Sequence, residues 1–306
     1  MMTVDVIIPT YKPDKKFECL IERLQKQEYP IHKIMILNTT TEQSLPEVEN
    51  VPYPVEITEI RTEEFDHGAT RNLGARMSEA DLLIYLTQDA VPVDKKLVSE
   101  FVKIFEKYQD VNLAYGRQLA NKDCSVIEKY TRSFNYPEKS RINSIQDMDE
   151  LGIKTFFFSD VCAAYRRKPF IQRGGFEEHI IFCEDTVYAG NCIMDGERLA
   201  YVSGAKVLHS HNYTCMQQFH RNFDVAVAQK KHPELYENVS SEGEGIRLVK
   251  QTAKYLLKIR KPWLIIELIM QSGFKYLGYF CGKRYQKLPR KVILWCTSSK
   301  KYWKFE

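Results

Sequence analysis

Residues 4–9, Val-Asp-Val-Ile-Ile-Pro, decide the fold. They form a short apolar run that ends at a proline, which is the pattern of a buried strand. Similar apolar runs follow at residues 33–38 and 81–87, and helical spacing of apolar residues lies between them, at 17–27 and 68–78. Because these strands alternate with helices, the sequence predicts an α/β fold with a mostly parallel sheet covered on both faces.

The same alternation extends further along the chain and then fades. The pattern predicts strands at 55–60, 112–115 and 199–202, an extended segment at 155–165, and helices at 95–108, 181–194 and 216–231. Residues 120–155 are polar and irregular, and we expect a variable loop or insertion there. The last part of the chain is rich in helical pattern, with breaks at Pro262 and Pro289.

The composition is that of a folded globular protein. Hydrophobic residues make up 44% of the chain and charged residues 27%, which argues against disorder. The net charge of +4 is too small to indicate a nucleic-acid partner. The eight cysteines contain no C-x-x-C pair, so we expect reduced thiols rather than disulfides or a zinc site. With neither a secretory-signal pattern nor a long apolar span, the chain is predicted to be cytoplasmic.

The charge is distributed unevenly. Residues 246–306 carry 15 basic and 2 acidic residues, which leaves 29 basic and 38 acidic residues in the rest of the chain. Within this basic region, six apolar side chains fall at helical spacing: Trp263, Ile266, Ile269, Met270, Phe274 and Leu277. We favour a helix whose apolar face packs on the body of the protein formed by the preceding residues. The alternative is a helix on an anionic membrane surface.

Polar residues follow three of the predicted strands, as Pro9-Thr10-Tyr11, Asn38-Thr39-Thr40 and Thr87-Gln88-Asp89. In open α/β sheets, ligands bind beyond the carboxyl ends of the strands, so the sequence predicts a binding site at this edge. The chain has neither G-x-G-x-x-G nor G-x-x-x-x-G-K, the usual signals of dinucleotide and P-loop sites.

Four groups of residues could carry chemistry. Asp89 could hold Mg²⁺ or Mn²⁺ bound to phosphates, or it could be a turn aspartate. One of Glu184 and Asp185 could face a cleft as a general base. Alternatively, both could simply be acidic residues that the helix dipole favours at the start of a helix. His209 and His211 form an H-x-H pattern. The two rings could bind a metal, or they could be structural or exposed on the surface.

Arg71 is the fourth candidate. It follows His67 and Gly68 at the predicted start of a helix, where free N–H groups favour an anion. The guanidinium could clamp a phosphate or order Asp89, or it could be a surface arginine.

Five strings of the sequence together resemble the inverting family 2 glycosyltransferases with the GT-A fold. They are VIIPTYKP (6–13), HGATRNLGA (67–75), YLTQDAVP (85–92), CAAYRRKPFIQRGGFEE (162–178) and EDTVYAGNCIMDG (184–196). The resemblance implies a GT-A domain at 1–245 and a basic helical region at 246–306. Within the family, FDHGATRN, LHSHNYT and KYLGYFCGKRYQKLPRK resemble bacterial rhamnosyltransferases of cell-surface polysaccharide assembly.

This resemblance implies a mechanism and a set of partners. Asp185, or its neighbour Glu184, would be the catalytic base, and Asp89 with His209 would hold Mg²⁺ or Mn²⁺. The residues implied for the nucleotide-sugar are Pro9, Thr10, Tyr11, Asn38, Arg71, Gln88 and Asp89. The donor would be dTDP-linked, with a UDP-hexose or UDP-N-acetylhexosamine as the alternative, and the acceptor a saccharide or a lipid-linked saccharide. An inactive scaffold that binds a partner or membrane is the alternative of another class.

The sequence departs from the family pattern at two places. The second strand ends in Asn38-Thr39-Thr40, where the family usually has an acidic residue that contacts the nucleotide. Thr87 stands where the metal motif often has a first aspartate, which leaves Asp89 as the one carboxylate of that motif.

Overall fold

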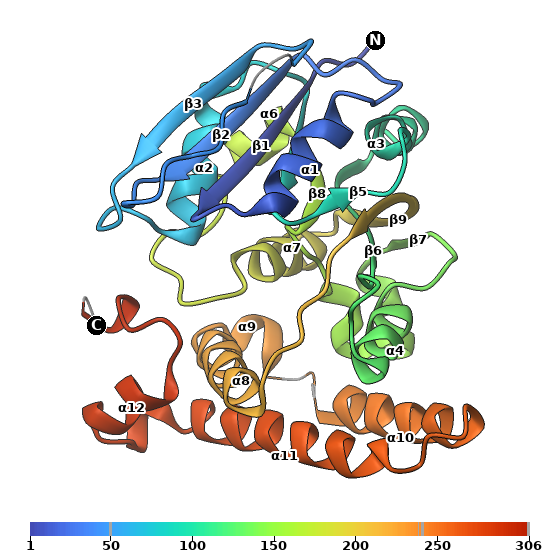
Figure 1. Ribbon diagram of the computed structural model, residues 1–306, viewed down its shortest axis with the longest axis vertical. Coiled ribbons are helices and arrows are strands. Elements are labelled where there is room, and N and C mark those ends of the chain that lie inside the picture. The colour runs from blue at the N-terminus through green and yellow to red at the C-terminus, as the bar shows by residue number, and fades with distance from the viewer. Residues whose placement is uncertain (49–50, 238, 240–241, 305–306) are drawn as a thin grey trace. The chain divides into compact units, whose positions relative to one another are not determined.

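The computed structural model describes residues 1–48, 51–237, 239 and 242–304. The chain folds into two compact units. The first unit contains residues 1–121, 136–178 and 184–210, and the second contains 122–135, 179–183 and 211–306. Figure 1 shows the strands gathered in one sheet, and the described strands all belong to the first unit.

The sheet is mixed. Its strands are β1 (Val4–Tyr11), β2 (Lys33–Thr39), β3 (Val55–Ile60), β4 (Leu82–Leu86), β5 (Val91–Pro92), β6 (Val111–Leu119), β7 (Arg141–Asn143), β8 (Cys162–Arg166) and β9 (Arg198–Leu208). They lie in the order β3-β2-β1-β4-β8-β6-β9-β5, and β7 pairs with β9. The first four strands in this order are parallel, whereas β8 runs antiparallel to β4 and β6. The predicted α/β fold is confirmed.

Helices of the first unit cover the sheet. They are α1 (Lys15–Leu24), α2 (His67–Met77), α3 (Leu97–Lys107), α5 (Met148–Leu151), α6 (Arg167–Gln172) and α7 (Glu184–Met194). In α1, Asp14 caps the first turn by accepting a hydrogen bond from the Lys16 N–H. Phe17, Leu20 and Leu24 are buried in the core, because their spacing places them on one face of the helix.

The second unit is helical. It contains α4 (Val126–Asn135), α8 (Cys215–Lys231), α9 (Pro233–Tyr236), α10 (Glu242–Lys258), α11 (Leu264–Gly282) and α12 (Arg290–Cys296). The backbones of α8 and α11 approach closely: a Cβ at Gly278 would lie 2.1 Å from the carbonyl oxygen of Phe219, and one at Gly282 would lie 2.3 Å from that of Phe223. Glycine is therefore required at both positions of α11.

Two predictions about local structure are wrong. The segment 120–155 is not an irregular loop, because it contains α4, where Ile127 packs with Leu256 and Leu268 in a buried cluster of the second unit. The segment 155–165 becomes a strand only from Cys162 onwards. Strand β9 ends at Leu208, and the H-x-H pattern of His209 and His211 follows it.

The favoured interpretation of α11 as a helix with a core-facing apolar face is also wrong. The helix buries Leu268, Gly278 and Gly282. Five of the six side chains assigned to the core are exposed instead, and these are Trp263, Ile266, Ile269, Met270 and Leu277. Among the described helices, none combines the length and the apolar content that crossing a bilayer requires.

Candidate functional site

The predicted nucleotide residues meet where the strand order reverses. The chain moves from β1 to β2 and β3 on one side and returns to β4 on the other, and such reversal points form ligand crevices. Gln88 bridges this point: its side-chain oxygen accepts the Tyr11 N–H at 2.8 Å, and its amide donates to the Tyr11 carbonyl at 3.0 Å. The Tyr11 ring is exposed beside the bridge, and Pro9 and Thr10 precede it on β1.

A hydrogen-bonded chain joins the ends of β1, β2 and β3. The Thr10 hydroxyl donates to Asn38 Oδ1 at 2.9 Å, and Asn38 Nδ2 donates to both oxygens of Glu59, at 3.1 and 3.0 Å. The Thr40 hydroxyl donates to Glu59 Oε2 at 2.9 Å. A carboxylate of β3 therefore lies against the end of β2, where the sequence of β2 has none. Sequence reasoning missed Glu59, although the register that pairs it with Asn38 could have revealed it.

The predicted metal residues lie together in the first unit. His209 Nε2 is 3.6 Å from Asp89 Oδ1, and the Thr87 hydroxyl donates to the same oxygen at 3.1 Å. Buried Gln118 accepts from His209 Nδ1 at 3.0 Å and donates its own amide to Ser159 Oγ. This arrangement places the Nδ1 proton on the side of Gln118 and makes Nε2 the nitrogen that can bind a metal. One carboxylate and one imidazole fit Mn²⁺ or Mg²⁺ whose other ligands are phosphate and water.

Asp185 is partly buried in the first turn of α7. Its Oδ2 accepts the Asp160 N–H at 2.9 Å, and its Oδ1 accepts the Thr186 N–H at 2.6 Å. Burial, and then the negative charge of Glu184, raise the pKa of the Asp185 carboxyl to about 6. A carboxylate in this environment is a stronger base than an exposed one.

The neighbouring Glu184 is held differently. Arg71 Nη1 lies 3.1 Å from Glu184 Oε1, and Arg71 Nε lies 3.3 Å from Asp160 Oδ2. Burial acts to raise the pKa of Glu184, but the cations Arg71 and His67 outweigh it, and this pKa is lowered. Glu184 is therefore the weaker base of the pair.

Arg71 was predicted to contact a phosphate or Asp89, but its guanidinium is buried against Glu184 and Asp160. Asp160 was not singled out from the sequence. It is buried, accepts the Tyr165 hydroxyl at 2.5 Å, and has a pKa raised by burial despite Arg71. Asp160 lies in none of the sequence motifs, so its contact with Arg71 could be recognised only in the folded structure.

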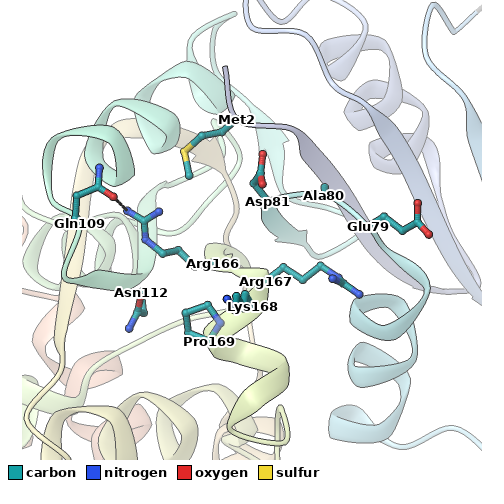
Figure 2. Close-up of a pocket in the computed structure, with 10 residues that line it drawn as sticks. All are labelled: Met2, Glu79, Ala80, Asp81, Gln109, Asn112, Arg166, Arg167, Lys168 and Pro169. Carbon is teal, nitrogen blue, oxygen red and sulfur yellow. Dashed lines mark hydrogen bonds between the residues drawn. The ribbon is translucent and has the colours of Figure 1, made fainter.

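The basic run Arg166-Arg167-Lys168 lines a pocket near the amino ends of β1 and β4 (Figure 2). The pocket is lined by Met2, Glu79, Ala80, Asp81, Gln109, Asn112, Arg166, Arg167, Lys168 and Pro169. Arg166 Nη2 donates to the Phe105 carbonyl at 2.5 Å, and Arg167 Nε donates to the Ala75 carbonyl at 3.2 Å. These two arginines tie backbone segments together, and none of the candidate catalytic residues lines this pocket.

Comparison with known proteins identifies the family of the chain. Residues 5–174 match Glycosyl transferase family 2. The chain is 36% identical over 305 residues to the O-antigen chain rhamnosyltransferase RfbN of Salmonella typhimurium, covering 99% of this chain and 96% of the relative. It is 35% identical over 306 residues to the O-antigen chain rhamnosyltransferase WbaN of Salmonella anatum, with the same two coverages.

Solved glycosyltransferases share the fold at low sequence identity. The mannosyltransferase PcManGT of Pyrobaculum calidifontis, in complex with GDP-Man and Mn²⁺, superposes with a TM-score of 0.57 at 15% identity, covering 99% of this chain and 83% of that one. TarS of S. aureus in complex with UDP-GlcNAc gives 0.55 at 12% identity, covering 94% and 92%. The fold predicted from the five strings is confirmed, and the chain belongs to glycosyl transferase family 2 as a glycosyltransferase of the GT-A fold.

Proposed function

We propose that the chain transfers rhamnose from a dTDP-linked donor to a saccharide or lipid-linked acceptor during cell-surface polysaccharide synthesis. The observation that carries this proposal is the partly buried carboxylate of Asp185, with its raised pKa, in a chain 36% identical to an O-antigen rhamnosyltransferase. Thermal shift with dTDP, UDP and GDP in the presence of Mn²⁺ tests the donor. The largest stabilisation is expected with dTDP, whereas a clear preference for UDP would favour a UDP-hexose or UDP-N-acetylhexosamine transferase.

The reaction is a single displacement with inversion. Asp185 takes the proton of the acceptor hydroxyl while the hydroxyl oxygen bonds to the anomeric carbon. The bond from that carbon to the donor diphosphate breaks at the same time, and the nucleotide diphosphate leaves. Base catalysis of this kind contributes about 10²- to 10⁴-fold in rate. Glu184, bound to Arg71, fixes the start of α7 from which Asp185 projects.

Asp89 and His209 are the residues we propose for Mg²⁺ or Mn²⁺, and His211, two residues further along the chain, is a candidate for a further ligand. A bound divalent ion would offset the charge that develops on the departing diphosphate. Gln118 supports this site by accepting a hydrogen bond from His209 Nδ1, which orients the His209 ring. The Mn²⁺ in the PcManGT complex supports manganese as the first ion to test.

We propose that the hydrogen-bonded side chains of Thr10, Asn38 and Glu59 recognise the nucleoside. Asn38 and Thr40 hold the exposed Glu59 carboxylate in one orientation, from which it can accept a hydrogen bond from a ribose hydroxyl or a pyrimidine imide.

Changing Glu59→Gln is expected to weaken dTDP binding about tenfold, because a hydrogen bond to a charged acceptor becomes a neutral one. Isothermal titration in Mn²⁺ measures this change. The matched control is Glu56→Gln on the same strand, where the carboxylate pairs with Lys33. Equal affinities in the Glu59 variant and the wild type would remove this residue from the nucleotide site.

The rate of transfer should rise with pH through an apparent pKa of about 6. The deprotonated form of Asp185 is the base, and its carboxyl has a pKa of about 6. A kcat profile from pH 5 to 8 with saturating donor tests this expectation. A rate independent of pH across this range would contradict the assignment of the base.

We also propose a cytoplasmic location, peripheral at an anionic membrane surface through residues 246–306. The cysteine spacing supports the first part, and the net charge of the basic region supports the second. We also propose that the motif order reflects one GT-A catalytic domain at 1–245, to which the basic helical region at 246–306 is appended.

A further inference from the structure

Helix α11 has an exposed apolar side. Trp263, Ile266 and Ile269 are 64%, 69% and 62% exposed, and the side continues along the helix to Leu277 and Phe280. At about 100° per residue, these side chains and Met270 fall within roughly 120° of the helix circumference. We call the six residues Trp263, Ile266, Ile269, Met270, Leu277 and Phe280 the apolar face of α11.

The opposite side of the same helix already has its partner. Leu268, Gly278 and Gly282 are buried, and the two glycines lie against the backbone of α8. Figure 1 shows α8 beside α11. The apolar face therefore does not complete the core of the second unit. With 19 residues, α11 is about 28 Å long, and contiguous apolar surface of this extent marks an interaction site.

Exposed basic side chains flank both ends of the apolar face. Lys258 and Arg260 precede α11, and Arg284, Lys287 and Lys291 follow it. The six residues of the apolar face carry no charge, and the exposed Glu267 lies at its edge, about 40° from Trp263 around the helix. This distribution of an apolar stripe between basic ends is typical of helices that lie in the plane of an anionic membrane.

We infer that α11 lies flat on an anionic bilayer, with its apolar face inserted at the level of the lipid headgroups and its basic ends on acidic phosphates. A second copy of the chain is a poorer occupant, because pairing this face would bring two regions of net charge +13 together. The inference deepens the proposed function, since a lipid-linked acceptor would lie at the same surface, but vesicle binding requires neither donor nor acceptor.

Flotation of the full chain with vesicles tests this inference. At low salt, the wild type is expected to float with phosphatidylethanolamine and phosphatidylglycerol at 3:1, and at least tenfold less with phosphatidylcholine alone. The variant Ile266→Glu/Met270→Glu should lower anionic-vesicle binding at least tenfold, because two apolar contacts become charges facing acidic lipid. Its matched control is Ile171→Glu/Met194→Glu, which changes the net charge equally at exposed positions of the first unit.

A second variant tests the electrostatic part. Lys258→Gln/Lys287→Gln/Lys291→Gln is expected to lower binding to the anionic vesicles about 10- to 100-fold and to reduce its dependence on salt. These three side chains are exposed, so the fold should persist, as circular dichroism can verify.

Three results would overturn the inference. They are absence of wild-type flotation, equal flotation of the Ile266→Glu/Met270→Glu variant, and a dimer in sedimentation equilibrium that this variant separates. Transfer to a soluble acceptor should be the same in the variant and the wild type. Failure of transfer in the wild type would count against the proposed function alone, because flotation is measured without donor or acceptor.

Discussion

Replacing Asp185 by asparagine is expected to lower kcat about 10²- to 10⁴-fold while leaving the affinity for dTDP unchanged. The amide cannot take the acceptor proton, but its oxygen can still accept the Asp160 N–H that the carboxylate accepts now. Release of nucleotide diphosphate in the presence of donor and acceptor measures kcat, and isothermal titration measures the affinity. Transfer at the wild-type rate by Asp185→Asn would show that another group is the base.

The stability of the same variant separates loss of the base from loss of the fold. The pKa of Asp185 is about 6 in the folded chain and about 4 in an unfolded one, so the wild type loses stability as pH rises between these values. Asparagine does not titrate, but it keeps only one of the two oxygens that accept the Asp160 and Thr186 N–H groups. Relative to the wild type, Asp185→Asn should therefore gain stability between pH 4 and pH 7.5, by on the order of 1 kcal/mol. Thermal unfolding of both proteins at the two pH values measures this change.

Replacing Arg71 by methionine is expected to destabilise the first unit by about 3–5 kcal/mol. The side chain that leaves is the buried cation between Glu184 and Asp160, and both carboxyl groups are themselves buried. Without Arg71 one or both must take up a proton or remain charged without a partner. Urea unfolding at pH 7.5 measures the loss, which should become smaller at pH 5 as the carboxylates protonate.

Two further variants make the Arg71 result specific. Arg76→Met on the same helix removes an exposed ion pair with Glu178, and its expected cost is below about 1 kcal/mol. The double variant Arg71→Met/Asp160→Asn should recover part of the lost stability, because one of the two unpaired charges is then absent. Equal costs for Arg71→Met and Arg76→Met would contradict the buried network.

The elements that the sequence predicts well are those whose signals are local. Apolar runs ending in proline or polar residues identify β1, β2 and β4, because a buried strand needs little more than such a run. In the same way, Asp89 is recognisable as a carboxylate just after a strand, and Asp185 as one at the start of a helix. Helix α4 was missed although Ile127, Tyr130 and Phe134 fall at helical spacing, because this ten-residue helix lies within a polar segment that otherwise lacks a regular pattern.

The residues that sequence reasoning missed contact partners that are far away in the sequence and become neighbours only in the folded sheet. Glu59 is recognisable only when β3 is aligned on β2, and Gln118 only when β6 is placed beside the segment after β9. Asp160 meets Arg71 across 89 positions of the chain, so no local spacing relates them. The same limit applies to α11, since an apolar stripe at helical spacing fits a buried face and an exposed face equally well.

The most direct test of the central claim is the mass of the product formed by the full chain with Mn²⁺ and lipid-linked saccharide acceptors from the source cells. The donors offered separately are dTDP-rhamnose, UDP-glucose, UDP-N-acetylglucosamine and GDP-mannose. The expected result is an acceptor heavier by one deoxyhexose, formed from dTDP-rhamnose alone and lost in Asp185→Asn. Transfer of a hexose or N-acetylhexosamine from a UDP donor, or an unchanged product yield in Asp185→Asn, would contradict it.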